Sequence, residues 1–213
     1  MYFFQLNIMD NQSSIIKATI ALIPFHGVSD DTLLKACIDL NLSEEFCKFH
    51  NGIYDVLNSI NENLINFINT KFHETENINN LKIREKVQHA VYLCLTYYMS
   101  LPNYRELLKS ILSATSYNMC FFSKSLYKLV DHIWYLIGDQ STDFNYYTKR
   151  TTLAVVYTST IMYFINDFSH NHSDTILFLE RRINNVIQIH KLKSYIANKT
   201  EKFNIFKVKF DDE

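Results

Sequence analysis

The stretch that decides the fold is GDQSTDFNYYTKR at Gly138–Arg150, together with the apolar run LAVVYTSTIMYF at residues 153–164. Glycine is common just past the end of a helix, so Gly138 should end one helix. Ser141, Thr142 and Asp143 are all favoured N-cap residues, so a second helix should begin among them. That helix is apolar on nearly every side, which predicts burial at the centre of a core. Its first turns carry two tyrosines, a lysine and an arginine, which we expect at the surface.

Composition favours one all-helical domain, or one domain with a small appendage. The chain has 213 residues, of which 47% are hydrophobic and 15% aromatic, enough for a sizeable core. Three glycines and two prolines are too few for a turn-rich β fold. No apolar run reaches the roughly 18 to 20 residues that a membrane-spanning helix needs. The first twelve residues lack the basic residues and the long apolar region of a signal peptide.

Apolar residues recur with helical spacing on either side of this stretch, and they predict about nine helices. The strongest amphipathic stripe lies just before Gly138 and consists of Leu126, Leu129, Val130, Ile133, Trp134 and Ile137. Serines mark four of the expected helix starts. We expect Ser13 or Ser14 to cap the first helix, Ser29 the second, Ser43 a very short third helix, and Ser173 the ninth.

Residues 13–70 have the pattern of a helix-turn-helix followed by a scaffold helix, and this placement resembles TetR-type regulators. Residues 29–50 carry five acids and two bases, a net charge of −3. Glu44 and Glu45 open the would-be recognition helix, where a phosphate contact would need N–H groups and basic side chains. We therefore expect an all-α, TetR-like bundle with a degenerate helix-turn-helix that binds no nucleic acid. A TetR-type ligand-responsive transcription regulator is the alternative.

Two further regions are expected after this N-terminal part. Residues 81–190 should form a helical domain for ligand binding and dimerisation. Residues 191–210 contain six lysines and one glutamate, a net charge of +5, and aromatic residues are interspersed among them. A basic amphipathic segment of this kind is typical of a membrane-surface anchor. A solvated or strand-like tail fits the pattern of residues 191–213 equally well.

A family resemblance can be stated from these residues. The signature at Gly138–Arg150, the apolar helix after it and FLERRI at 178–183 resemble the Coq-nine family of ubiquinone-biosynthesis accessory proteins, most strongly over residues 132–190. The opening PFHG at 24–27 agrees with it. The resemblance implies a TetR-like fold without DNA binding, a homodimer, and a lipid held where TetR regulators hold their effectors. Tyr146 stands where the family commonly has tryptophan, which removes indole area and an N–H donor.

The resemblance also implies partners and site residues. Its members support a di-iron hydroxylase that acts on the quinone ring, so we expect partner-binding residues in the signature: Asp143, Asn145, Tyr146, Tyr147, Thr148, Lys149 and Arg150. The apolar helix and the stripe before it could together wall a cavity for an acyl or prenyl chain. The expected lipid-binding residues are Leu126, Val130, Ile133, Trp134, Leu153, Val156, Tyr157, Ile161, Met162 and Phe164. A tightly filled core is the alternative reading of the same residues.

The chemistry-bearing residues favour a protein that is not an enzyme. A di-iron site needs Glu-x-x-His on two helices, and Glu85 precedes His89 by four residues. His170 and His172 beside Asp167 and Asp174 form one polar loop without a distant partner. We expect no metal and no cofactor. The expected location is a bacterial cytoplasm beside the inner membrane, or the mitochondrial matrix side in a eukaryote, with an isoprenoid or quinone intermediate as ligand.

Overall fold

The computed structural model describes residues 2–186, with side chains from residue 11 onward except that of Asp143. Every regular element within this range is a helix, which confirms the all-α expectation. The segment 191–213 and its predicted membrane contact lie outside the described residues.

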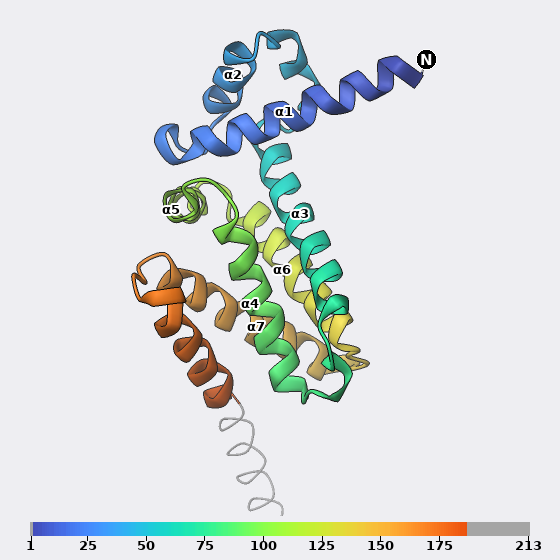
Figure 1. Ribbon diagram of the computed structural model, residues 1–213, viewed down its shortest axis with the longest axis vertical. Coiled ribbons are helices and arrows are strands. Elements are labelled where there is room, and N and C mark those ends of the chain that lie inside the picture. The colour runs from blue at the N-terminus through green and yellow to red at the C-terminus, as the bar shows by residue number, and fades with distance from the viewer. Residues whose placement is uncertain (1, 187–213) are drawn as a thin grey trace, which may run out of the picture.

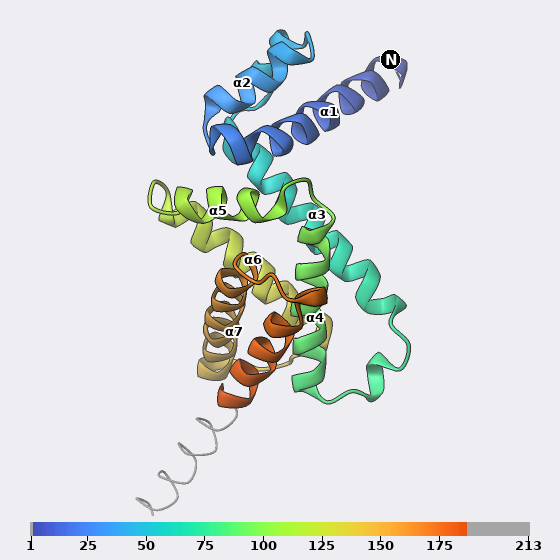
Figure 2. The ribbon, with the colours of Figure 1, turned by 60° about the vertical axis from the view of Figure 1, so that its left-hand side comes forward.

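The N-terminal helices form a group at one end of the molecule. Figures 1 and 2 show α1 (Tyr2–His26) crossing above the body, with α2 (Asp30–Asp39) beside it. The helix α3 (Ile53–Glu74) runs from this group into the body, where it contacts α4 (Ile83–Met99) and α6 (Met119–Ile137). Because α3 also contacts α1 and α2, it joins the two parts.

The body is built from helices packed around the second half of the chain. The helix α5 (Tyr104–Ala114) lies between the N-terminal group and the body and contacts α1. The helix α7 (Asp143–Phe164) packs on α6 and α4. A further helical segment, 173–186, lies beside α7. There the ring of Phe178 stacks on that of Tyr163, with the ring centroids 4.5 Å apart. Short 3-10 turns, η2 (Ile78–Asn80) and η3 (His170–His172), lie in the connections.

The predicted helix ends are partly right. Ser29 caps α2, because its hydroxyl accepts the N–H of Thr32 at 3.3 Å. The predicted start of the first helix is wrong, since α1 already begins at Tyr2 and includes Ser13 and Ser14. It also includes Pro24 in its last turns, although Gly27 ends it as expected, with a φ of 80°.

The cap expected for the last helix is also wrong. Ser173 itself is helical, and the N–H groups of Asp174 and Thr175 are accepted by Ser169 Oγ at 3.1 Å and Asp167 Oδ2 at 2.9 Å. Burial works to raise the pKa of Asp167, but the hydrogen bonds from Ser169 and Thr175 outweigh it and hold that pKa below its ordinary range. Asp167 caps this helix in place of Ser173, because a carboxylate is a charged acceptor and makes a stronger hydrogen bond than a hydroxyl.

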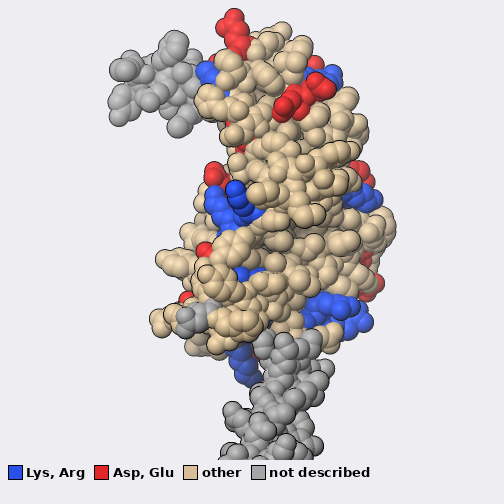
Figure 3. Space-filling model, turned by 180° about the vertical axis from the view of Figure 1, so that it is seen from behind, with Lys and Arg blue, Asp and Glu red and all other residues tan. Residues whose placement is uncertain are grey.

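The third element of the helix-turn-helix pattern is not an α-helix. The segment η1 (Ser43–Lys48) is a 3-10 helix of six residues with no buried side chain. The predicted Ser43 cap is wrong, because Leu42 is the N-cap residue and Ser43 is the first residue of η1. Glu44 and Glu45 lie in its first turn, and Lys48 pairs with Glu45 at 2.6 Å. On the face drawn in Figure 3, acidic and basic side chains form small separate groups around a broad uncharged area. The absence of nucleic-acid binding stays a prediction.

The start of α3 depends on one glycine. Gly52 has φ 57° and ψ −132°, a conformation that is strained for any residue with a side chain. The carboxylate of Asp30 lies over it and accepts the N–H of Ile53 at 2.7 Å, so it satisfies one free donor at the start of the helix. A Cβ on Gly52 would lie 2.1 Å from that carboxylate.

We expect Gly52→Ala to lower the free energy of unfolding by about 2 to 4 kcal/mol, because it adds backbone strain and displaces a charged hydrogen bond. Gly138→Ala is the matched control. Its φ is 83° but no atom lies within 4 Å of the new Cβ, so it should cost only about 1 kcal/mol. Urea unfolding of both variants measures the difference, and equal losses would contradict a role for Asp30.

Candidate functional site

The boundary between α6 and α7 is where the predicted signature lies. Gly138 adopts the left-handed conformation and ends α6, as expected, and Asp139 N–H returns to the carbonyl of Trp134 at 3.0 Å. The helix α7 begins at Asp143, within the predicted set of capping residues. Its N-cap residue is Thr142, whose side chain makes no capping hydrogen bond.

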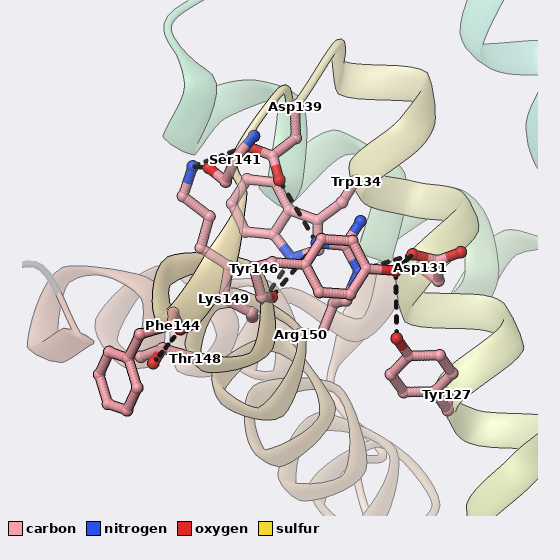
Figure 4. Close-up of polar contacts among 10 residues, drawn as sticks. All are labelled: Tyr127, Asp131, Trp134, Asp139, Ser141, Phe144, Tyr146, Thr148, Lys149 and Arg150. Carbon is pink, nitrogen blue, oxygen red and sulfur yellow. Dashed lines mark hydrogen bonds and ion pairs between the residues drawn. The ribbon is translucent and has the colours of Figure 1, made fainter.

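Asp139 is the first centre of a polar network between the two helices (Figure 4). Its side chain is buried, and Lys149 Nζ donates to Oδ1 at 2.7 Å. The Ser141 hydroxyl donates to the same oxygen at 2.7 Å. Burial alone would raise the pKa of Asp139. The hydrogen bonds from Lys149 and Ser141 outweigh this effect and hold the pKa below its ordinary value, so the group is a carboxylate at neutral pH.

Arg150 is the second centre of this network. Its Nε lies 2.6 Å from Asp131 Oδ1, and Nη1 lies 3.4 Å from Asp139 Oδ2. The guanidinium also stacks on the ring of Tyr146, with Cζ 3.3 Å from the ring centroid. The Tyr146 hydroxyl donates to Asp131 at 2.9 Å and accepts from Tyr127 at 3.1 Å. These bonds tie the first turns of α7 to α6.

The expectation that the first turns of α7 present a tyrosine, lysine and arginine surface is therefore wrong in part. Arg150 is only 5% exposed, because two carboxylates from α6 and its loop draw it inward. Lys149 is bonded within the network, and Tyr146 is partly buried. Tyr147 is 65% exposed and Asn145 is also exposed, as expected, whereas the side chain of Asp143 lies outside the described residues. Thr148 bonds to the carbonyl of Phe144.

Sequence reasoning missed Phe144, which is 80% exposed. Figure 4 shows its ring on the side of α7 that faces away from the Asp139–Arg150 network. With Tyr147 three residues later, it forms an exposed aromatic pair at the start of α7. A large apolar residue in the first turn of the predicted helix, two positions after Thr142, was the sequence signal that could have revealed it.

A first pocket of about 270 Å³ lies among α3, α4, α5, α6 and α7. Three predicted lipid-binding residues, Leu126, Tyr157 and Ile161, line it. Its other walls come from helices that periodicity assigned only to the core. They include Leu57, Ile60, Tyr98, Leu108, Ile111 and Leu112. We call this space the inner pocket.

A second pocket of about 300 Å³ lies on another side of α7, against α4 and the segment 173–186. Three other predicted lipid-binding residues, Trp134, Leu153 and Val156, line it, together with Lys149 and Arg84. The helix α7 thus separates two spaces where the sequence suggested one cavity. Val130, Ile133 and Phe164 line neither pocket and are buried in the core.

The prediction that Met162 lines the lipid cavity is wrong, because its side chain is 57% exposed. The helix α7 is apolar on nearly every side, yet only one face is buried. Val155, at 65% exposure, lies on the outer face, two turns before Met162. An apolar helix cannot be oriented from its own sequence when both of its faces are apolar.

Metal ligands and membrane spans can be checked over the described part of the chain. Between residues 2 and 186, no three His, Cys, Asp or Glu side chains come together in a way that could hold a metal. His172 instead bonds to the hydroxyl of Tyr104 at 3.0 Å. None of the described helices is both long and apolar enough to cross a membrane.

We expect Arg150→Ala to lower the free energy of unfolding by about 3 kcal/mol, since it leaves buried Asp139 without one of its two cations. Tyr147→Ala should change it by less than about 0.5 kcal/mol, because the ring is exposed. Tyr146→Ala should be intermediate, through loss of the stacking and of the bond to Asp131. Thermal and urea unfolding measure all three, and a neutral Arg150→Ala would contradict the structural role.

Comparison with known proteins shows what the region around this site is similar to. Residues 105–190 match the COQ9 family model, and this range contains the signature, α7 and the FLERRI segment. The chain is 28% identical over 190 residues to the probable ubiquinone biosynthesis protein coq9, mitochondrial, of Dictyostelium discoideum. That alignment covers 85% of this chain and 61% of the relative.

Animal relatives match over a shorter region. The human ubiquinone biosynthesis protein COQ9, mitochondrial, is 44% identical over 64 residues, which are 30% of this chain and 20% of that protein. The Drosophila melanogaster protein of the same name is 39% identical over 75 residues, 35% and 23% of the two chains. The chain thus spans less than two thirds of the relatives it matches. The region 105–190 thus resembles the COQ9 family, and the relatives that match it are named as ubiquinone biosynthesis proteins.

Proposed function

We propose that this protein takes part in ubiquinone biosynthesis as an accessory protein that binds an isoprenoid lipid and brings it to a quinone-ring hydroxylase. The observation that carries the proposal is the inner pocket. The names of the relatives support the pathway, and their description as mitochondrial supports the matrix side rather than a bacterial cytoplasm.

The lining of the inner pocket supports an apolar ligand. Its walls are mostly Leu, Ile, Phe and Tyr side chains from five helices. A volume of about 270 Å³ lies just below the usual range of roughly 300 to 1,000 Å³ for small-molecule sites, so it suits one end of a prenylated ring. The rest of the tail would leave past Met119, which is exposed at the edge of the pocket.

The aromatic pair Phe144 and Tyr147 supports a docking surface for the di-iron hydroxylase. Exposed aromatic side chains on a rigid helix are enriched among the residues that contribute most to binding energy at interfaces. Lys149 and Arg150 hold the helix beneath them and do not reach the partner in this proposal. The basic segment 191–213, outside the described residues, would hold the complex at the membrane surface.

The outer face of α7 supports a homodimer. Val155 and Met162 lie two turns apart on this face, and Leu177 on the segment 173–186 is 55% exposed. Exposed apolar residues from two adjacent helices fit the self-complementary surface of a two-fold dimer. No observation at the site favours the alternative of a transcription regulator.

Lipid binding is tested by extracting lipids from the purified protein and measuring them by mass spectrometry. We expect an isoprenoid lipid in the native protein and at least a tenfold lower amount in Ile161→Arg and Ile111→Trp, which respectively place a charge in the inner pocket and fill it. Met162→Arg is the control, because it puts the same charge one residue away on the exposed face. Equal lipid in all variants would contradict the assignment of the pocket.

Hydroxylase docking is tested with Phe144→Ala and Tyr147→Ala in a quantitative pull-down. Each should weaken the association by about 2 kcal/mol, or roughly thirtyfold, without loss of folding. Tyr117→Ala serves as control, since Tyr117 is equally exposed but lies between α5 and α6. Normal association of both variants would show that the pair does not face the hydroxylase.

The dimer is tested by light scattering coupled to gel filtration. Val155→Glu should convert the protein to a monomer, because it buries a charge without a partner at the interface. Ile38→Glu, an exposed apolar position on α2, should leave the dimer intact. A native monomer, or a dimer that persists in Val155→Glu, would refute this face as the interface.

A further inference from the structure

Two tyrosines of the inner pocket are hydrogen-bonded to each other. Tyr98 on α4 and Tyr157 on α7 both line the pocket, and their hydroxyl oxygens lie 3.0 Å apart. Both side chains are buried. The other polar side chains of the lining, such as Asn61, Thr115 and Ser125, are only partly buried. The tyrosine pair is therefore the polar group at the deep side of the pocket.

One hydroxyl hydrogen of the Tyr98–Tyr157 pair has no acceptor among the described residues. Two hydroxyls carry two hydrogens, and the bond between them uses one. Among the described residues, neither oxygen makes a second hydrogen bond to the protein. By contrast, the neighbouring Tyr97, also buried, donates to the carbonyl of Ile60 at 3.4 Å, and Asn61 donates to Ser125. A buried donor without an acceptor is costly, which favours a ligand that supplies one.

Both hydroxyls are donors at neutral pH. Burial raises the pKa of Tyr98 and of Tyr157 well above the ordinary value for tyrosine. The pair is therefore neutral and can offer its remaining hydrogen to an uncharged oxygen without placing a charge in an apolar space. A quinone ring fits this need, because its carbonyl oxygens accept hydrogen bonds and the ring donates none.

We propose that the Tyr98–Tyr157 pair binds the ring oxygen of a quinone, with the ring at the deep end of the inner pocket and the hydrocarbon tail toward Met119. The inference rests on the proposed lipid-binding function and specifies the ligand class and its orientation. In this arrangement the ring is shielded from water until the lipid leaves the pocket. The pair selects for a ring that carries an acceptor oxygen over a ring of the same size without one.

The test compares two probes with the same decyl chain, a decyl-substituted 1,4-benzoquinone and decylbenzene. The quinone carries two ring carbonyl oxygens, and the benzene ring carries none. Each is delivered from cyclodextrin to the full chain, and the bound amount is measured by mass spectrometry. We expect the native protein to prefer the quinone by about tenfold, the effect of one hydrogen bond. The double variant Tyr98→Phe with Tyr157→Phe should lose this preference and bind decylbenzene as before.

Tyr97→Phe is the matched control, because it removes a buried hydroxyl that does not line the pocket. It should keep the tenfold preference. A double variant that still prefers the quinone, or an equal loss in Tyr97→Phe, overturns the inference. Equal binding of both probes by the native protein also overturns it but leaves the lipid-binding function standing. If the native protein takes up neither probe, the proposed function fails together with the inference.

Discussion

The ion pairs of Arg150 are the contacts on which the second half of this molecule depends. The guanidinium lies between Asp131 of α6 and Asp139 of the following loop, and it is nearly inaccessible to water. Bringing these charges out of water is unfavourable unless they are paired and hydrogen-bonded. Each partner meets that condition through Tyr146, Ser141 or Lys149. These contacts hold the first turns of α7 against α6.

That constraint sets which residues of α7 face inward. Arg150, Tyr157, Ile161 and Phe164 are separated by seven, four and three residues, so they lie along one face of the helix. Once Arg150 is held against α6, Tyr157 and Ile161 must line the inner pocket. Phe144, Tyr147, Val155 and Met162 must then face outward. One helix thereby carries a pocket wall on one side and an apolar surface on the other.

The signature GDQSTDFNYYTKR contains two groups of residues, one that holds the turn together and one that is exposed at the surface. Asp139, Ser141, Lys149 and Arg150 bond to one another or to α6, and so they hold the turn and the helix start. Phe144 and Tyr147 make the exposed surface. A motif of consecutive residues can thus hold two roles, because successive helical positions point about 100° apart.

Local signals in the sequence determined the all-helical class and many of the boundaries. Gly138 and Ser29 act as expected, because a left-handed glycine and a capping hydroxyl act on backbone groups only a few residues away. A cap supplied from farther away was missed: Asp167, rather than Ser173, holds the start of the segment 173–186.

Only the tertiary structure decided the orientation of α7 and the shape of the space beside it. A helix that is apolar all round carries no periodicity to say which face is buried, so Met162 was placed inside. Arg150 points inward because it pairs with Asp131 and Asp139, which lie 19 and 11 residues earlier in the chain. The packing of α6 against α7 brings these carboxylates to the guanidinium. The two pockets and the Tyr98–Tyr157 contact likewise join helices far apart in the chain. Sequence spacing defines the face of a single helix, but the partner of that face is fixed only when the helices pack.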